Sequence, residues 1–167
     1  MSIARFRKIY IFIDRLRTVV IIGIFTFIIT VGAVQIFMRY MPEINPMSWV
    51  DEIMRYLNIW LVLLAASIGV KQGIHLRMDY LLYRFVSEKG IKVVRLVTEL
   101  AMMASLILLI YFGFLRVMDN RYTVIQSMPL SIAWFYAAIP VGGIFILFEN
   151  LLIFIHGKHP YTDVDDI

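Results

Sequence analysis

Four apolar stretches, each about as long as a membrane-crossing helix, alternate with shorter polar connections along the chain. They cover residues 18–38, 50–71, 96–115 and 130–154. A helix needs about 20 apolar residues to cross the roughly 30 Å of hydrocarbon in a bilayer. The pattern therefore predicts an all-α integral membrane protein with four transmembrane helices.

Amphipathic segments flank these spans and predict helices that lie on the membrane surface. Residues 3–16 combine apolar positions at helical spacing with several arginines, and residues 79–89 show the same pattern between the second and third spans. The uncharged part of the second span, residues 56–70, is short for a bilayer. Its helix is therefore expected to begin at Trp49 and to run first along the outer surface.

The fourth span contains residues that are expected to mark its start and to kink it. Pro129 suits a helix start, and Trp134 lies about one turn inside, at the depth of the aromatic belt. Pro140, followed by Gly142 and Gly143, is expected to kink this helix.

Composition agrees with a membrane protein. Of the 167 residues, 61% are hydrophobic and 17% are charged, with a mean hydropathy of +0.82. The net charge of +4 comes from basic residues beside the apolar runs, which indicates lipid head groups and no nucleic acid as partner. The chain has no cysteine, so disulfides and thiolate metal sites are excluded.

The distribution of Lys and Arg predicts the orientation. Twelve of these residues fall on the side of the two termini and four on the other side. By the positive-inside rule both termini are cytoplasmic, and the Trp49 end of the second span faces outward.

Ionisable residues inside the spans are few. Glu99 and Glu149 lie near the cytoplasmic ends, where pairing with the basic connection is the simpler interpretation, and a proton or sodium relay is the alternative. His75, His156 and His159 lie at or beyond helix ends, which disfavours a haem site within the membrane. No span offers a nucleophile with a neighbouring base, so no catalytic residue, cofactor site or metal site is expected.

The absence of catalytic features points to a partner protein, and two other functions stay open. One is the membrane anchor of a respiratory oxidoreductase. The other is a small homodimeric carrier, although the four-helix exporters of that kind depend on a glutamate in their first helix and residues 18–38 contain none.

Three groups of residues resemble a known family, the small membrane (Q) subunit of tripartite ATP-independent periplasmic (TRAP) transporters. The similarity covers nearly the whole chain. The similarity rests on the order of these motifs across the four spans. Its residues are Trp49, Asp51, Glu52, Arg55 and Trp60, then Lys71, Gly73, His75 and Asp79, and finally Pro129, Trp134, Pro140 and Gly142.

The resemblance implies a bacterial inner-membrane symporter for organic acids such as sialic acid or C4-dicarboxylates. A large membrane subunit would carry the sodium and substrate sites and move as an elevator, and this chain would enlarge its fixed scaffold. The motif residues would then be scaffold and subunit contacts. A periplasmic substrate-binding protein is implied as a further partner, and the outer charges Glu43, Asp119 and Arg121 are candidate contacts for it.

Overall fold

The computed structural model describes residues 3–41, 47–72, 88–156 and 159–161. Four long helical segments in this part of the chain are apolar enough to cross a membrane, which confirms the four predicted spans. The elements, in chain order, are α1 (Ile3–Arg39), α2 (Ser48–Lys71), α4 (Glu88–Asp119), β1 (Val124–Ile125), β2 (Met128–Ser131), α5 (Ala133–Tyr136) and α6 (Ala138–His156).

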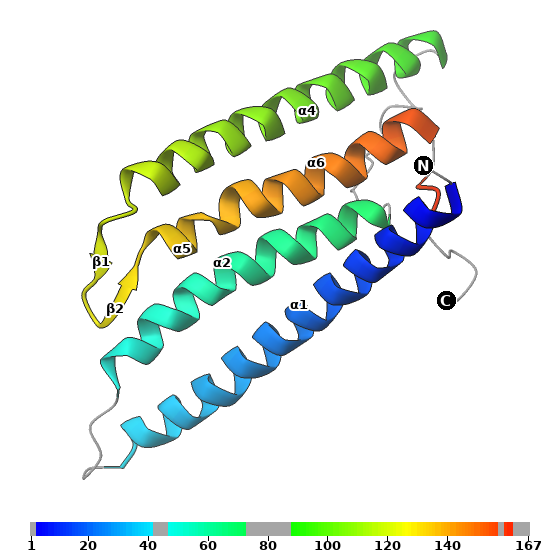
Figure 1. Cartoon of the computed structure of the whole chain (residues 1–167). Helices are drawn as coiled ribbons and strands as arrows, with labels where there is room; N and C mark the ends of the chain where they lie inside the picture. Colours follow the sequence, from blue (N-terminus) through cyan, green and yellow to red (C-terminus); the bar gives the residue numbers. More distant parts are fainter. Residues whose placement is uncertain (1–2, 42–46, 73–87, 157–158, 162–167) are drawn as a thin grey trace.

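The four long helices lie in a single row, in the order α1, α2, α6 and α4 (Figure 1). Among the described residues, the extensive contacts between long helices are those of α1 with α2, α2 with α6, and α6 with α4. The first and last helices of the row therefore each pack along one side, and both broad faces of the row remain exposed.

Small residues of α6 let it occupy the centre of the row. A Cβ added at Gly142 would lie 2.5 Å from Leu63 Cβ of α2, and one added at Gly143 would lie 2.8 Å from Ile110 Cγ1 of α4. Neither distance is possible for a real Cβ contact, so both neighbours of α6 approach to a separation that only glycine permits.

The fourth span is interrupted, as predicted, but one turn earlier than the proline itself. Ala137 separates α5 from α6, and Pro140 is the third residue of α6. A proline has no N–H to bond the carbonyl four residues before it, and its ring crowds that carbonyl. Here that carbonyl belongs to Tyr136, so the helix breaks directly after this residue.

The start of the fourth span was predicted wrongly. Pro129 does not begin a helix but lies in β2, which pairs antiparallel with β1 across the two residues 126–127. The helical part begins only at Ala133. The preceding Thr-Val-Ile at 123–125 is rich in β-branched residues, and such residues favour strands.

The predicted separate surface helices also need correction. Residues 3–16 are helical but continue without a break into the first span, so α1 is one helix of 37 residues. The helix of the second span begins at Ser48, next to the predicted start at Trp49, and is continuous with its span as expected. The helix expected at 79–89 lies outside the described residues, apart from its last two positions, which begin α4.

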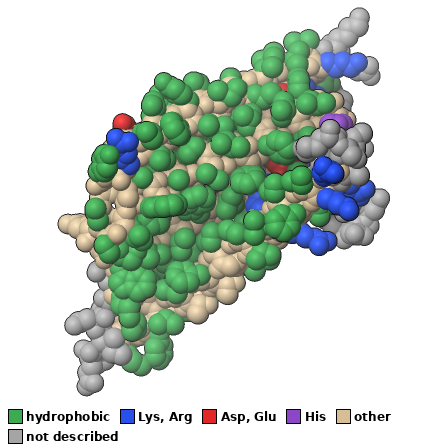
Figure 2. Space-filling view, viewed as in Figure 1, with side chains coloured by type: hydrophobic (Ala, Val, Ile, Leu, Met, Phe, Trp, Pro, Cys, Tyr) green, Lys and Arg blue, Asp and Glu red, His purple; other side chains and the backbone are tan. Residues whose placement is uncertain are grey.

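The surface of the row is mostly apolar. Figure 2 shows hydrophobic side chains over most of one face, with Lys and Arg gathered at the end where α1 begins. Large exposed apolar side chains occur on all four long helices, among them Phe12, Val62, Phe112 and Ile144. Lipid or another membrane subunit must cover these side chains.

Candidate functional site

Seven polar residues meet at one end of the row, where α1 begins and where α2 and α6 end. They come from three helices and from the segment that follows α6. The members of this polar cluster are Tyr10, Asp14, Arg17, Ser67, Lys71, Glu149 and His159.

Glu149 is the centre of the polar cluster and is only 1% exposed. Its Oε1 accepts a hydrogen bond from Arg17 Nη1 at 2.8 Å. Its Oε2 accepts one from Tyr10 Oη at 2.9 Å and lies 2.7 Å from His159 Nε2. Both carboxylate oxygens therefore have partners, as a buried charge requires.

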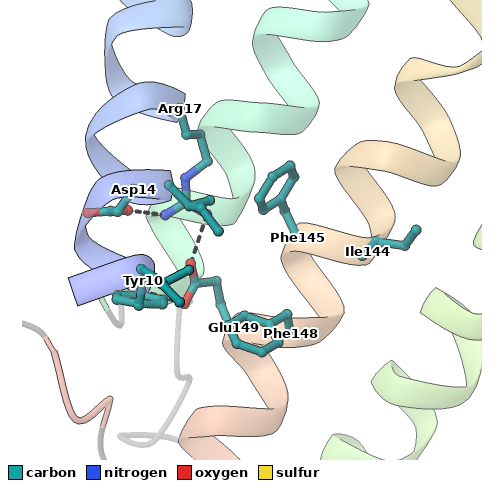
Figure 3. Close-up of a pocket in the computed structure, with 9 residues that line it drawn as sticks. Tyr10, Asp14, Arg17, Ile144, Phe145, Phe148 and Glu149 are labelled. Carbon is teal, nitrogen blue, oxygen red and sulfur yellow. Dashed lines mark hydrogen bonds and ion pairs between the residues drawn. The ribbon is translucent and has the colours of Figure 1, made fainter. Parts of the chain in front are cut away.

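Arg17 also bonds residues of α2 and of α1. It is 5% exposed, and its Nη1 also donates to Ser67 Oγ at 3.0 Å. Its Nη2 pairs with Asp14, one turn earlier on α1, as Figure 3 shows. Asp14 in turn accepts a hydrogen bond from Lys71 Nζ at 2.7 Å. The end of α2 is thus tied to α1, and α1 is tied to α6.

The segment after α6 folds back onto the start of α1. The Tyr161 ring packs against the Tyr10 ring with their centres 4.7 Å apart and their planes tilted by 30°, and the Tyr161 amide donates to His159 Nδ1 at 3.3 Å. With Nδ1 as acceptor, the neutral imidazole carries its proton on Nε2 and donates it to Glu149. His159 therefore completes the set of polar partners around Glu149.

The charges of the polar cluster compensate one another. Arg17 and Lys71 supply two positive charges, and Asp14 and Glu149 supply two negative ones. No net charge is left to attract an ion, and each oxygen of Glu149 is already engaged. This arrangement favours structural pairing over a proton or sodium relay.

Sequence reasoning missed the polar cluster. Arg17 was counted among the basic residues that set the orientation, and Glu149 was paired with the basic connection, whereas the structure pairs these two residues with each other across 132 positions. The overlooked signal is the stripe Tyr10, Asp14 and Arg17, which recurs at helical spacing along one side of α1.

The motif at the start of α2 binds neighbouring elements. Asp51 pairs with Arg39 of α1 at 2.8 Å, and Glu52 accepts a hydrogen bond from Ser127 of the hairpin. The spacing of Asp51 and Glu52 before Arg55 would suit a local ion network on α2, but the two carboxylates bond Arg39 and Ser127 instead. Among the described side chains none bonds the exposed guanidinium of Arg55.

The remaining predicted residues are spread over the row. Trp49 and Trp60 are half-buried on α2, and Trp134 of α5 is 70% exposed. Pro140 and Gly142 are buried in α6, and Pro129, Asp119 and Arg121 are exposed at or beside the hairpin. Lys71 joins the polar cluster. Glu43, Gly73, His75 and Asp79 lie outside the described residues.

The structure does not bring the predicted motif residues into one site. Lys71 lies at the end of α2 where α1 begins, whereas Asp51, Glu52 and the hairpin lie at the opposite end (Figure 1). No group of three or more His, Asp or Glu side chains within the described ranges is placed to hold a metal ion.

Comparisons with known proteins agree with the four-span fold. Residues 28–156 match the profile of the tripartite ATP-independent periplasmic transporters, DctQ component. The sialic acid TRAP transporter small permease protein SiaQ of Vibrio cholerae serotype O1 is 23% identical over 151 residues, which cover 90% of this chain and 84% of that protein.

A second relative is a larger protein. The sialic acid TRAP transporter permease protein SiaT of Haemophilus influenzae strain 86-028NP is 26% identical over 105 residues, which are 63% of this chain and 17% of that protein. The family profile spans more than half of the chain and includes α2, α4, α5 and all of α6. The chain therefore belongs to the DctQ component family of the tripartite ATP-independent periplasmic transporters, and it is a small membrane subunit of this kind.

Proposed function

We propose that this chain is the non-catalytic scaffold subunit of a sodium-coupled transporter for organic acids of the sialic acid class. It would support a larger, elevator-type membrane subunit and help to dock a periplasmic substrate-binding protein. Membership of a transporter family confirms the prediction that the chain is not an enzyme. It also agrees with a multi-pass protein of the inner membrane.

The observation that best supports a scaffold role is that side-chain contacts join neighbouring helices of the row near both of its ends. At one end the polar cluster ties α1, α2 and α6 together. At the other end the hairpin and α5 rest on α2, where Ser127 bonds Glu52 and the Phe135 ring stacks on the Tyr56 ring at 4.2 Å. Such a row resists shear between its helices and presents two broad apolar faces to a neighbouring subunit.

The orientation with both termini in the cytoplasm is part of this proposal. The contact between the Tyr10 and Tyr161 rings brings the start of α1 and the segment after α6 to the same side, as an even number of spans requires. The excess of Lys and Arg at this side supports a cytoplasmic location by the positive-inside rule. The hairpin and the start of α2 then face the periplasm, where a binding protein would dock.

Reconstitution in proteoliposomes tests this function. We expect sodium-driven uptake of sialic acid, with the binding protein present, only when this chain and the large subunit are both reconstituted. A C4-dicarboxylate is the matched alternative substrate, and collapsing the sodium gradient is the control for coupling.

Two results would contradict the proposal. Uptake by this chain alone would indicate a homodimeric carrier. A Soret band in the absorbance spectrum of the purified chain would indicate a haem-binding respiratory anchor.

A further inference from the structure

An apolar groove lies between α1 and α6 at the end of the row where the polar cluster sits (Figure 3). Its volume is about 220 Å³. Ile9 and Ile13 of α1 form one wall, and Ile144, Phe145 and Phe148 of α6 form the other. The groove exists because α2 lies between these two helices in the row and holds them apart.

The floor of the groove is closed to charged ligands. Arg17 and Glu149 bridge the two walls and bond each other at 2.8 Å, and both are nearly fully buried. The Phe145 ring covers the guanidinium, with Arg17 Cζ 5.5 Å from the ring centre. A molecule in the groove therefore meets mainly the side chains of isoleucine and phenylalanine.

The mouth of the groove is exposed. Ile9, Ile13, Ile144 and Phe148 are between 37% and 55% exposed. An engineered apolar cavity of roughly 150 Å³ already holds a benzene molecule, so a groove of this size offers room for several methylene groups. In a bilayer, the apolar molecules available to fill such a groove are the acyl chains of the surrounding lipids.

A cation lies on α1 one helical turn before the first residue of the groove. Arg5 is exposed and precedes Ile9 by one helical turn, and Ile13 follows by another, so the three residues share one side of α1. This order, a cation followed by two turns of apolar side chains, matches an anionic head group followed by an acyl chain.

We propose that this groove binds the acyl chain of an anionic phospholipid, whose phosphate is held by Arg5. The lipid fills the gap between α1 and α6 and covers the buried ion pair beneath it. Because the site is built from this chain alone, it does not depend on the proposed scaffold role or on the transported substrate.

Photo-crosslinking tests the lipid site. The full chain, alone and in complex with the large subunit, is placed in nanodiscs of phosphatidylethanolamine that contain phosphatidylglycerol with a diazirine on its acyl chain. We expect adducts, located by mass spectrometry, on the peptides that contain Ile9, Ile13, Ile144 and Phe148. These adducts should form in both preparations.

Three variants separate this site from lipid that merely surrounds the protein. Ile13→Trp fills the groove and should lower its labelling about tenfold, the factor that corresponds to a loss of about 1.4 kcal/mol of binding. Ile22→Trp is the matched control, since Ile22 is 58% exposed on the opposite side of α1 and its replacement should leave labelling unchanged. Arg5→Gln should remove the preference for phosphatidylglycerol over a diazirine-bearing phosphatidylethanolamine while the chain stays folded.

Three results would overturn the proposal. Adducts spread evenly over both sides of α1 would mean surrounding lipid only. Groove labelling that disappears when the large subunit is present would mean that this subunit occupies the groove. Equal labelling by both head groups in the unmodified chain would refute the role of Arg5.

Discussion

At the scale of single residues, the polar cluster shows how a membrane protein can hold four charges together, two of which, Arg17 and Glu149, are buried. Each ion in it has an opposite charge within hydrogen-bonding distance, and Tyr10, Ser67 and His159 satisfy further polar atoms. A buried ion pair contributes little stability compared with apolar residues of the same size, but removing one partner leaves the other charge uncompensated. The contribution of the pair to the stability of the fold therefore depends on both members being present.

This asymmetry gives the first prediction. Arg17→Met should lower the free energy of unfolding by about 3 kcal/mol, because Glu149 then loses its cationic partner in a buried site. The double variant Arg17→Met, Glu149→Met should recover most of this loss. Stability is measured by denaturant titration of the purified chain in mixed micelles.

The pair of Arg39 and Asp51 is the matched control for this prediction. Its nitrogen–oxygen distance is also 2.8 Å, but its side chains are 55% and 48% exposed. Solvent and lipid head groups screen such a pair, so Arg39→Met should change the free energy of unfolding by less than about 1 kcal/mol. Equal losses of unfolding free energy in Arg17→Met and Arg39→Met would show that burial does not determine how much the Arg17–Glu149 pair matters for stability.

At the scale of helices, α6 determines the shape of the row because its glycines allow two neighbours to approach closely. The distances from an added Cβ at Gly142 and Gly143 to side chains of α2 and α4 are both below 3.0 Å. Gly69, on the other hand, has no neighbouring atom within 4 Å of an added Cβ. The same residue type thus serves packing at two positions and is dispensable at another.

The second prediction uses this difference. Gly142→Ala should lower the free energy of unfolding by about 1 to 3 kcal/mol, because the new methyl group would overlap Leu63 and push α2 away from α6. Gly69→Ala should be neutral or slightly stabilising, since alanine is the better helix former. The two variants are compared by thermal unfolding in the same detergent, and similar losses would contradict the role assigned to Gly142.

The sequence predicted the four spans because each is a long apolar run, and the family resemblance followed from motifs at their ends. It did not predict the polar cluster, since Arg17 and Glu149 pair through a tertiary contact that no local pattern records. The break after Tyr136 was misplaced because a proline acts on the carbonyl one turn before it. The hairpin of β1 and β2 was not predicted because a strand as short as Val124–Ile125 gives little periodic signal.

At the scale of the whole molecule, the two ends of the row have different chemistry. The end with the hairpin exposes a few isolated charges, among them Asp119 and Arg121, whose guanidinium lies over the Tyr122 ring at 4.6 Å. The other end concentrates basic side chains and the polar cluster (Figure 2). Different partners are therefore expected at the two membrane surfaces.

The third prediction concerns docking at the hairpin end. Reversing both charges, with Asp119→Lys and Arg121→Glu, should lower uptake at low salt and at limiting binding protein by about tenfold, because complementary charges speed association. High salt screens such charges, so the difference from the unmodified transporter should shrink as salt is raised. Uptake that keeps the same rate and the same salt dependence would count against a docking role for this end.

The last prediction concerns Arg55, the motif residue whose side chain remains exposed while Asp51 and Glu52 are engaged by α1 and the hairpin. An arginine left in this position suits contact with the large subunit, and loss of such an anchor at an interface typically costs about 2 kcal/mol. Arg55→Ala should therefore weaken co-purification of the large subunit and lower uptake, while the amount of this chain in the membrane stays the same. Arg39→Ala is the control, because Arg39 is exposed at the same end but pairs within the chain. If the amount of inserted chain falls together with uptake, Arg55 anchors α2 at the membrane surface and does not contact a partner.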